Sequence, residues 1–226
     1  GLPRSEKGKT VFDVLPHAFA ASVTEQIRKG VRIAGGCCGT TPEYIKTLVQ
    51  AAKDLLPVPL QPKELCRISS YTHAVTFGDS PILIGERINP TGKKRFQQAL
   101  REKDLNYILG EGLKQQERGV QVLDVNVGLP DVDESALLAE TVCQLQAVTD
   151  LPLQIDTSHP VAMENALRRY NGKALINSVN GKPESMDAVF PLVQRYGGAV
   201  IALTMDQNGI PATAEDVQAF REPMDL

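Results

Sequence analysis

The chain has 226 residues, enough for one large domain or for parts of two. Its 24 basic and 27 acidic residues are well mixed and give a net charge of −3, which argues against nucleic-acid binding because that function needs a basic face. No apolar run approaches the length of a membrane-spanning helix, and the polar start is not a secretory signal. The four cysteines follow no disulfide framework, so we expect a reducing, cytoplasmic setting. Since residue 1 is not methionine, we also expect a piece of a longer polypeptide.

The first segment, residues 1–56, has the pattern of a loop, a helix, a strand and a second helix. Phe19, Val23 and Ile27 are spaced to share one face of a helix within residues 11–29. This spacing predicts that the helix buries one side.

The rest of this segment holds the predicted strand and the second helix. A short apolar run predicts a buried strand over residues 31–35. Thr41 as N-cap and Pro42 in the first turn predict a helix over residues 42–56.

Two adjacent cysteines, Cys37 and Cys38, lie between that strand and that helix, with glycines on both sides. Paired thiolates suit zinc, and the glycines allow a sharp bend that turns both sulfurs toward one ion. The alternative is a pair of buried, inert cysteines. The flanking glycines favour a metal site. His17, the one histidine of this segment, follows a proline at the start of a loop and is a poor third ligand.

Three prolines within six residues open the segment 57–80. Such a run cannot continue a helix or join a central strand. We expect residues 57–80 to link a domain over residues 1–56 to a second domain over residues 81–226. Short strands are expected near residues 65–68 and 74–77.

From residue 81 onward, apolar runs alternate with helical stretches. Continuous apolar runs mark parallel strands buried on both faces, and a strand-to-strand spacing of about 30 residues fits a (β/α)8 barrel or a doubly wound fold. No Gly-x-Gly-x-x-Gly follows the first strand, which counts against a dinucleotide-binding fold. The expected strands are 82–88, 122–127, 153–156, 174–178 and 199–205, and the expected helices are 96–118 with a break near residues 103–104, 134–149, 161–170 and 185–196.

Each of these strands ends in polar residues. In a parallel barrel the carboxyl ends of the strands share one face, so the polar residues should converge there. They are carboxylates and carboxamides without a nucleophile–histidine pair, so no catalytic residue is assigned. This composition suits recognition of a flat heterocycle such as a pterin, whose ring N–H and amino group can both donate to one carboxylate. The candidate pterin-binding residues are Glu86, Asn89, Asp124, Asn126, Asp156 and Asn177.

Some polar residues have a simpler interpretation. Asp133 is expected to cap a helix, and Asn126, two residues before a glycine, could form a turn. Asp124, Asp156 and Asn177 lie within or at the tips of apolar strands, where an unpaired polar group is costly, so we interpret these three as site residues.

The motif Gly35-Gly36-Cys37-Cys38-Gly39-Thr40-Thr41-Pro42 resembles the end of the homocysteine-binding domain of cobalamin-dependent methionine synthases. The resemblance implies that Cys37 and Cys38 bind a zinc ion that holds the homocysteine thiol as a thiolate. That family takes a third cysteine ligand from an earlier strand. Cys66 and Cys143 come later and lack the glycine-flanked context, so the resemblance implies an incomplete metal site here.

Four later segments resemble the pterin-binding domain shared by methionine synthases, corrinoid methyltransferases of acetogens and dihydropteroate synthases. They are Gly85-Glu86-Arg87-Ile88-Asn89-Pro90-Thr91-Gly92, Asp124-Val125-Asn126-Val127-Gly128, Gln154-Ile155-Asp156-Thr157-Ser158 and Ile176-Asn177-Ser178-Val179-Asn180. The resemblance implies that Asp156 and Asn177 contact the pterin and that Asn89 and Asp124 line the same pocket. The family's barrel has three further strands, which are expected to lie past residue 226.

Together the resemblances imply two partial (β/α)8 TIM barrels joined by a Pro-rich linker, from a methyltransferase of the methionine synthase type. Such an enzyme moves methyl from 5-methyltetrahydrofolate, through cobalamin on a separate domain, to homocysteine. The isolated chain is expected to be inactive. One alternative is a stand-alone pterin enzyme, either a methyltetrahydrofolate–corrinoid methyltransferase or a dihydropteroate synthase, and another is a non-enzymatic folate-binding fragment. The upstream cysteine pair speaks against a stand-alone pterin enzyme.

Overall fold

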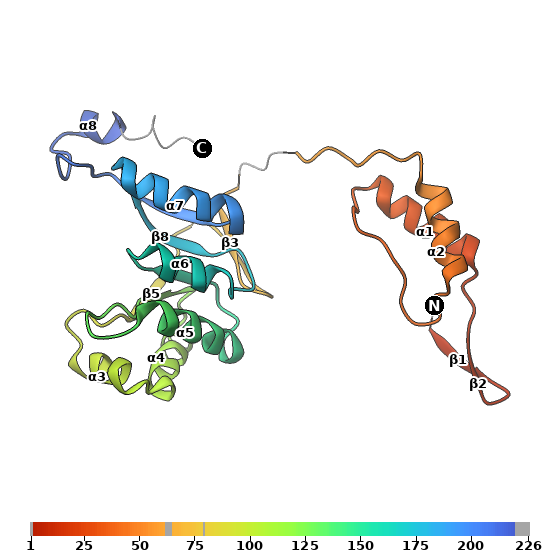
Figure 1. Cartoon of the computed structure of the whole chain (residues 1–226), viewed down its shortest axis with the longest axis horizontal. Coiled ribbons are helices and arrows are strands. Elements are labelled where there is room, and N and C mark those ends of the chain that lie inside the picture. The colour runs from red at the N-terminus through yellow and green to blue at the C-terminus, as the bar shows by residue number, and fades with distance from the viewer. Residues whose placement is uncertain (1, 62–64, 79, 220–226) are drawn as a thin grey trace. The chain divides into compact units, whose positions relative to one another are not determined.

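The computed structural model describes residues 2–61, 65–78 and 80–219 (Figure 1). The chain forms two compact units, which divide between residues 64 and 65. No helix within the described residues is long and apolar enough to cross a membrane.

The first unit begins with an antiparallel hairpin of β1 (Pro3–Glu6) and β2 (Lys9–Phe12). Its two-residue turn places Lys7 at φ 49° and Gly8 at φ 78°. Positive φ at both central positions gives the turn type whose twist matches that of paired strands. This stretch was expected to be a loop, because its four-residue strands carry no buried apolar alternation.

Two helices follow, α1 (Pro16–Arg28) and α2 (Pro42–Ala52), and they pack against each other. Phe19 and Tyr44 meet edge to face with ring centroids 5.8 Å apart, and the Tyr44 hydroxyl donates to the Val14 carbonyl oxygen at 2.7 Å. Both predicted helices are therefore confirmed, with shorter bounds.

The predicted strand over residues 31–35 is wrong. The segment is irregular and exposed, and the Ile33 side chain is 93% exposed. A strand needs a neighbour to complete its hydrogen bonds, and within residues 2–61 the two strands β1 and β2 pair with each other. An apolar run without such a neighbour stays unpaired.

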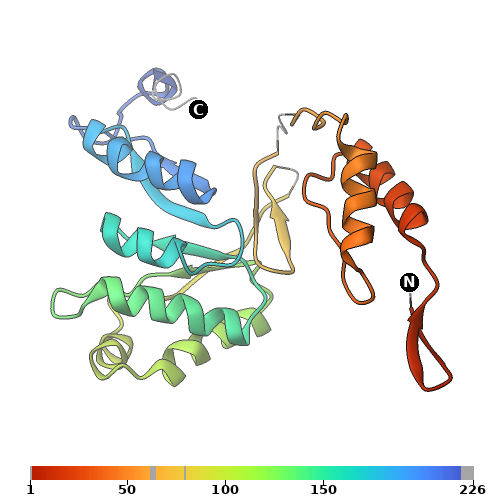
Figure 2. The ribbon, with the colours of Figure 1, turned by 45° about the vertical axis from the view of Figure 1, so that its right-hand side comes forward.

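The second unit is built on a five-stranded parallel sheet in the order β5-β6-β7-β8-β9, as predicted. Helices α3 to α7 lie along one face of this sheet (Figure 2), and α8 follows the last strand. The strands are β5 (Ile84–Ile88), β6 (Val122–Val125), β7 (Leu153–Asp156), β8 (Leu175–Asn180) and β9 (Ala199–Leu203). The helices are α3 (Lys94–Glu102), α4 (Leu105–Glu117), α5 (Glu134–Val148), α6 (Pro160–Leu167), α7 (Pro183–Tyr196) and α8 (Ala214–Ala219).

The predicted break in the first helical stretch is confirmed. Lys103 ends α3 in the left-handed region at φ 53°, and the Asp104 side chain accepts from the Tyr107 backbone N–H at 3.1 Å to cap α4.

The main core lies between the sheet and its helices. Leu123, Val125, Leu153 and Ile155 are fully buried in it, packed with residues of the covering helices. Because successive side chains of a strand point to opposite faces, the residues that alternate with them turn to the other face of the sheet. This alternation places the candidate site on the face away from the helices.

A second hairpin, β3 (Arg67–Ser69) and β4 (Ala74–Thr76), packs at the beginning of the strands on that other face. Buried Ile68 contacts an apolar cluster that includes Val122 and Leu175. The predicted short strands are thus confirmed, with slightly shifted bounds. The apolar cluster fills the start of this face, and the polar residues lie further along the strands.

Candidate functional site

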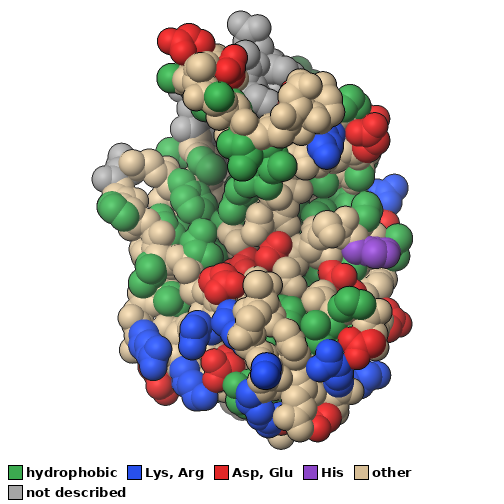
Figure 3. Space-filling model, turned by 90° about the vertical axis from the view of Figure 1, so that its left-hand side faces the viewer, with side chains coloured by type: hydrophobic (Ala, Val, Ile, Leu, Met, Phe, Trp, Pro, Cys, Tyr) green, Lys and Arg blue, Asp and Glu red, His purple; other side chains and the backbone are tan. Residues whose placement is uncertain are grey.

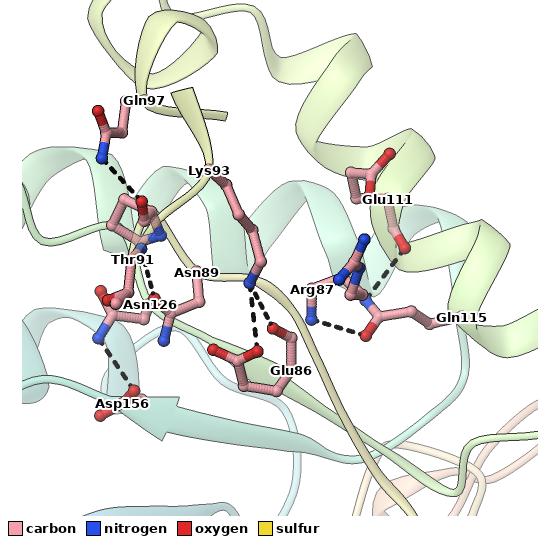
Figure 4. Close-up of polar contacts among 11 residues, drawn as sticks. Glu86, Arg87, Asn89, Thr91, Lys93, Gln97, Glu111, Gln115, Asn126 and Asp156 are labelled. Atoms are coloured by element: carbon pink, nitrogen blue, oxygen red, sulfur yellow. Dashed lines mark hydrogen bonds and ion pairs between the residues drawn. The ribbon is translucent and has the colours of Figure 1, made fainter. Parts of the chain in front are cut away.

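Two side-chain pairs bridge β6 and β7 on the face away from the helices. Asp124 and Gln154 are direct cross-strand neighbours, and the Gln154 amide Nε2 donates to Asp124 Oδ1. One pleat further along, Asn126 Nδ2 donates to Asp156 Oδ2 at 2.9 Å (Figure 4). Each pair joins one carboxylate to one carboxamide, and the two carboxylates lie diagonally across the strands.

The two acids of these pairs are held in a poorly solvated, negative environment. Asp124 is 2% exposed, and its burial together with the charge of Asp156 raises its pKa to about 7, although the hydrogen bond from Gln154 acts in the opposite direction. Burial is also the largest cause that raises the pKa of Asp156. The hydrogen bond from Asn126 lowers this pKa, and the charges of Glu86 and Glu134 raise it further. Asp124 therefore exchanges a proton near neutral pH.

The strand β5 and the loop after it bring Glu86 and Asn89 to the same edge of the sheet. The Asn126 backbone N–H donates to the Ile88 carbonyl oxygen at 2.9 Å, which holds the end of β5 beside the end of β6. Buried Asn89 accepts from the Thr91 N–H at 2.9 Å and so orders the turn.

Lys93 folds back over the strand that precedes this loop. Its ammonium donates to the Glu86 carbonyl oxygen at 2.9 Å and to the Glu86 carboxylate at 3.2 Å, as Figure 4 shows. The lysine thereby offsets part of the negative charge at the edge of the site.

The loop after β7 is fixed by a relay of short polar contacts. The Thr157 hydroxyl donates to the Glu134 carboxylate, and the His159 N–H donates back to Thr157 Oγ1 at 3.0 Å. His159 is the N-cap of α6, directly before the proline that begins the helix. Asp133 caps α5 through the Ala136 N–H at 3.1 Å, so its structural role is confirmed.

The structure thus brings the six predicted residues to the carboxyl ends of adjacent strands. Asn177 on β8 pairs in register with Asp156 on β7, and its side chain lowers the pKa of Asp124 through a hydrogen bond. Asn126 forms the turn that its place before a glycine suggested, because its Oδ1 accepts from the Gly128 N–H at 2.9 Å, and its Nδ2 holds Asp156. Figure 3 views the molecule from the left-hand side of Figure 1 and shows acidic side chains in the middle of the surface, with hydrophobic side chains above them and basic side chains below.

Gln154 and Lys93 were missed by the sequence analysis. Gln154 could have been found from strand alternation, since it shares a face with Asp156 two residues later. Lys93 gave no such signal, because a lysine in a turn is ordinarily solvated.

The cysteine pair of the first unit lies in a tight, exposed turn. The Cys37 N–H donates to Thr40 Oγ1 at 3.0 Å, and the Thr40 N–H returns to the Cys37 carbonyl oxygen at 3.0 Å. Gly39 follows at φ 80°, where a Cβ atom would meet the Phe12 ring. Both thiols are free, and hydrogen bonds from the Cys38 backbone and then its thiol lower the pKa of Cys37.

The two sulfurs match part of a zinc site. They are 3.7 Å apart, and two thiolates bound at about 2.3 Å to one tetrahedral zinc would be separated by roughly that distance. Zinc takes at least three protein ligands. Across residues 2–61, 65–78 and 80–219, no group of three or more histidine, cysteine, aspartate or glutamate side chains is placed to hold a metal ion. Cys37 and Cys38 therefore do not make a zinc site by themselves.

Comparison with protein families gives two matches. The model described as pterin binding enzyme matches residues 85–224, which include all six candidate site residues. The model described as homocysteine S-methyltransferase matches residues 1–52, which include both cysteines of the turn.

Two similar proteins span both units. Methionine synthase of Mycobacterium tuberculosis (strain ATCC 25618 / H37Rv) is 31% identical over 223 residues, which is 95% of this chain and 19% of that protein. Methionine synthase of Mycobacterium leprae (strain TN) is 31% identical over 215 residues, or 90% of this chain and 18% of that protein. The chain thus spans about a fifth of the length of these relatives. Among solved structures, dihydropteroate synthase from Xanthomonas albilineans in complex with 7,8-dihydropteroate is 25% identical, with a TM-score of 0.39 over 60% of this chain and 47% of that one.

Proposed function

This chain belongs to the pterin binding enzyme family, and we propose that its second unit binds the pterin ring of a reduced folate. The residues assigned to this role are the six at the carboxyl ends of β5 to β8, namely Glu86, Asn89, Asp124, Asn126, Asp156 and Asn177. The family match to residues 85–224 and the placement of these six residues support the proposal.

The observation that carries the proposal is the alternation of carboxylates and carboxamides across β6 and β7. In the second pair the Asn126 amide holds one oxygen of the partly exposed Asp156 carboxylate and leaves the other oxygen to accept from a ligand. A pterin offers a ring N–H beside an amino group, which is the donor edge that such a carboxylate accepts. Asn177 can both donate and accept, and so can satisfy another part of the ring edge.

The proton held by Asp124 gives this site chemistry besides binding. An acid whose pKa is about 7 can donate a hydrogen bond to a ring atom or accept one from it near neutral pH. Around it, the Asn126–Asp156 bond and the Thr157–Glu134 contact keep the loops after β6 and β7 in place. The residues thus orient the ring before any group is transferred.

We further propose that the chain is a segment of a methionine synthase type of methyltransferase. Similarity to two such enzymes runs through both units, and the homocysteine S-methyltransferase match covers the first. In this proposal the units are parts of two (β/α)8 barrels, with the Pro-rich run that opens residues 57–80 as the linker between them. The substrates are 5-methyltetrahydrofolate and homocysteine.

Two cofactors belong to that proposal. Cobalamin, bound by a separate domain, supplies a cobalt centre that carries the methyl group. Zinc, when bound, makes a thiol more acidic, and Cys37 and Cys38 would supply two of its ligands.

The test is calorimetric titration of 5-methyltetrahydrofolate into the chain and into Asp156→Ala. Loss of the carboxylate leaves the ligand's donors unpaired, so binding should weaken by about 2 kcal/mol, roughly thirtyfold. The matched control is Asp131→Ala, which removes an exposed carboxylate that pairs with Arg101 at 2.7 Å. Equal affinity of wild type and Asp156→Ala would refute the assignment.

A further inference from the structure

The side chain of Gln154 has one satisfied end and one unsatisfied end. It is 4% exposed, its Nε2 donates to Asp124, and its Oε1 is buried without a hydrogen-bond partner. A buried amide oxygen without a partner is uncommon in folded proteins and calls for an explanation. The partner across the strand, Asp124, is the buried acid of the site.

An amide is suited to an acid that gains and loses a proton. Toward the ionised Asp124 carboxylate, Gln154 donates through Nε2. Toward the protonated acid, whose O–H is a donor, the amide can turn over and accept through Oε1. The same side chain can therefore stay paired with Asp124 in both states, and the unpaired oxygen is the one that the second state uses.

The groups around Asp124 are mostly negative. Asp156 faces it from β7 and Glu86 from β5, while Glu134 on α5 acts on Asp156. The ammonium of Lys93 is engaged by Glu86 at 3.2 Å. The amide dipole of Gln154, with the contribution of Asn177, is what favours the ionised carboxylate of Asp124.

We propose that Gln154 is a positioning residue for Asp124. It holds one carboxyl oxygen across the strand, and it does so whether or not the acid carries a proton. The ligand part of this inference rests on the proposed pterin function, whereas the effect on Asp124 can be measured without any ligand.

The experiment follows the Asp124 carboxyl carbon by NMR in the full chain as pH is raised, with the signal assigned by its loss in Asp124→Asn. Gln154→Met and Gln154→Leu both remove the amide and its N–H donor without adding a charge. Each should raise the titration midpoint of Asp124 by about one pH unit, a tenfold fall in its acid dissociation constant. The pH at which the affinity for 5-methyltetrahydrofolate changes should rise together with the titration midpoint of Asp124.

The control is Gln115→Met. Gln115 is also 4% exposed and also bridges two elements, since it accepts from the Arg87 N–H at 2.8 Å and donates to the Glu111 carbonyl oxygen at 3.0 Å. It does not bond Asp124, so its loss should weaken the fold and leave the midpoint unchanged.

The outcomes are separable. An unchanged Asp124 midpoint in both Gln154 variants would overturn the inference, as would an equal shift in Gln115→Met. A shift specific to the Gln154 variants supports it. If that shift occurs while the wild-type chain binds no folate, the positioning of Asp124 stands and the pterin function fails.

Discussion

Replacing Asp124 by asparagine should make the chain more stable at alkaline pH. The substitution keeps the shape of the side chain and an oxygen for the Gln154 N–H, and removes the buried charge. Because the pKa of Asp124 rises from 3.8 to about 7 on folding, the folded state holds a proton that the unfolded state has already lost. The wild-type free energy of unfolding therefore falls as pH rises from about 4 to about 7, and the full cost, about 4 kcal/mol, is present at pH 8.

The assay is urea unfolding of wild type and Asp124→Asn at several pH values, followed by circular dichroism. Titrating groups that do not interact with Asp124 cancel in the difference between the two proteins. We predict a difference near zero at pH 4 that grows to as much as about 4 kcal/mol in favour of the variant at pH 8. Asp131→Asn should show no such growth between pH 4 and pH 8, because the hydrogen bond from Arg101 lowers the pKa of that exposed acid and its effect on stability is confined to pH values below about 4. A difference between wild type and Asp124→Asn that does not change with pH would refute the reasoning.

Two further predictions concern the packing of each unit. The buried Tyr170 hydroxyl donates to the Ser69 carbonyl oxygen at 2.9 Å and accepts from a backbone N–H of β7 at 3.0 Å. Tyr170→Phe should therefore lower the free energy of unfolding by about 1–3 kcal/mol in the same urea assay. An unchanged free energy of unfolding would mean that this hydroxyl does not hold the β3–β4 hairpin. Gly39→Ala should separate the thiols of Cys37 and Cys38, because Gly39 has φ 80° and no room for a Cβ atom. Cadmium binding, followed by thiolate absorbance, should therefore be weaker in Gly39→Ala than in Gly35→Ala. Gly35 is the control because nothing lies within 4 Å of the atom added there. Equal cadmium affinity in the two glycine variants would show that the turn does not set the cysteine geometry.

The sheet of the second unit could be predicted because its strands are buried on both faces. Such strands give nearly continuous apolar runs, as in Val122–Val125 where only Asp124 is polar, and the polar residues near the strand ends mark the edge that holds the candidate site. Gln154 was not predicted as a site residue because a single uncharged amide inside an apolar strand gives no signal of a function. Its importance depends on register, which places Asp124 opposite it and is not visible in either segment alone.

The first unit was predicted less well. The run at residues 31–35 has the composition of a strand, but strand formation depends on a neighbour supplied by another segment. The β1–β2 hairpin was missed because its strands are short and mostly exposed, and Lys7-Gly8 is a weak turn signal. In both cases the deciding contacts lie outside the local sequence.

The measurement that tests the central claim most directly is NMR of the side-chain amide groups during titration of the chain with 5-methyltetrahydrofolate. The account predicts that the Asn126 and Asn177 amide signals shift together and saturate, since both amides lie at the carboxyl ends of the strands beside Asp156. The amide of Gln50, on the exposed surface of α2, should not move. Saturation of the ligand without any shift of Asn126 and Asn177 would contradict the claim that these strand ends bind the pterin.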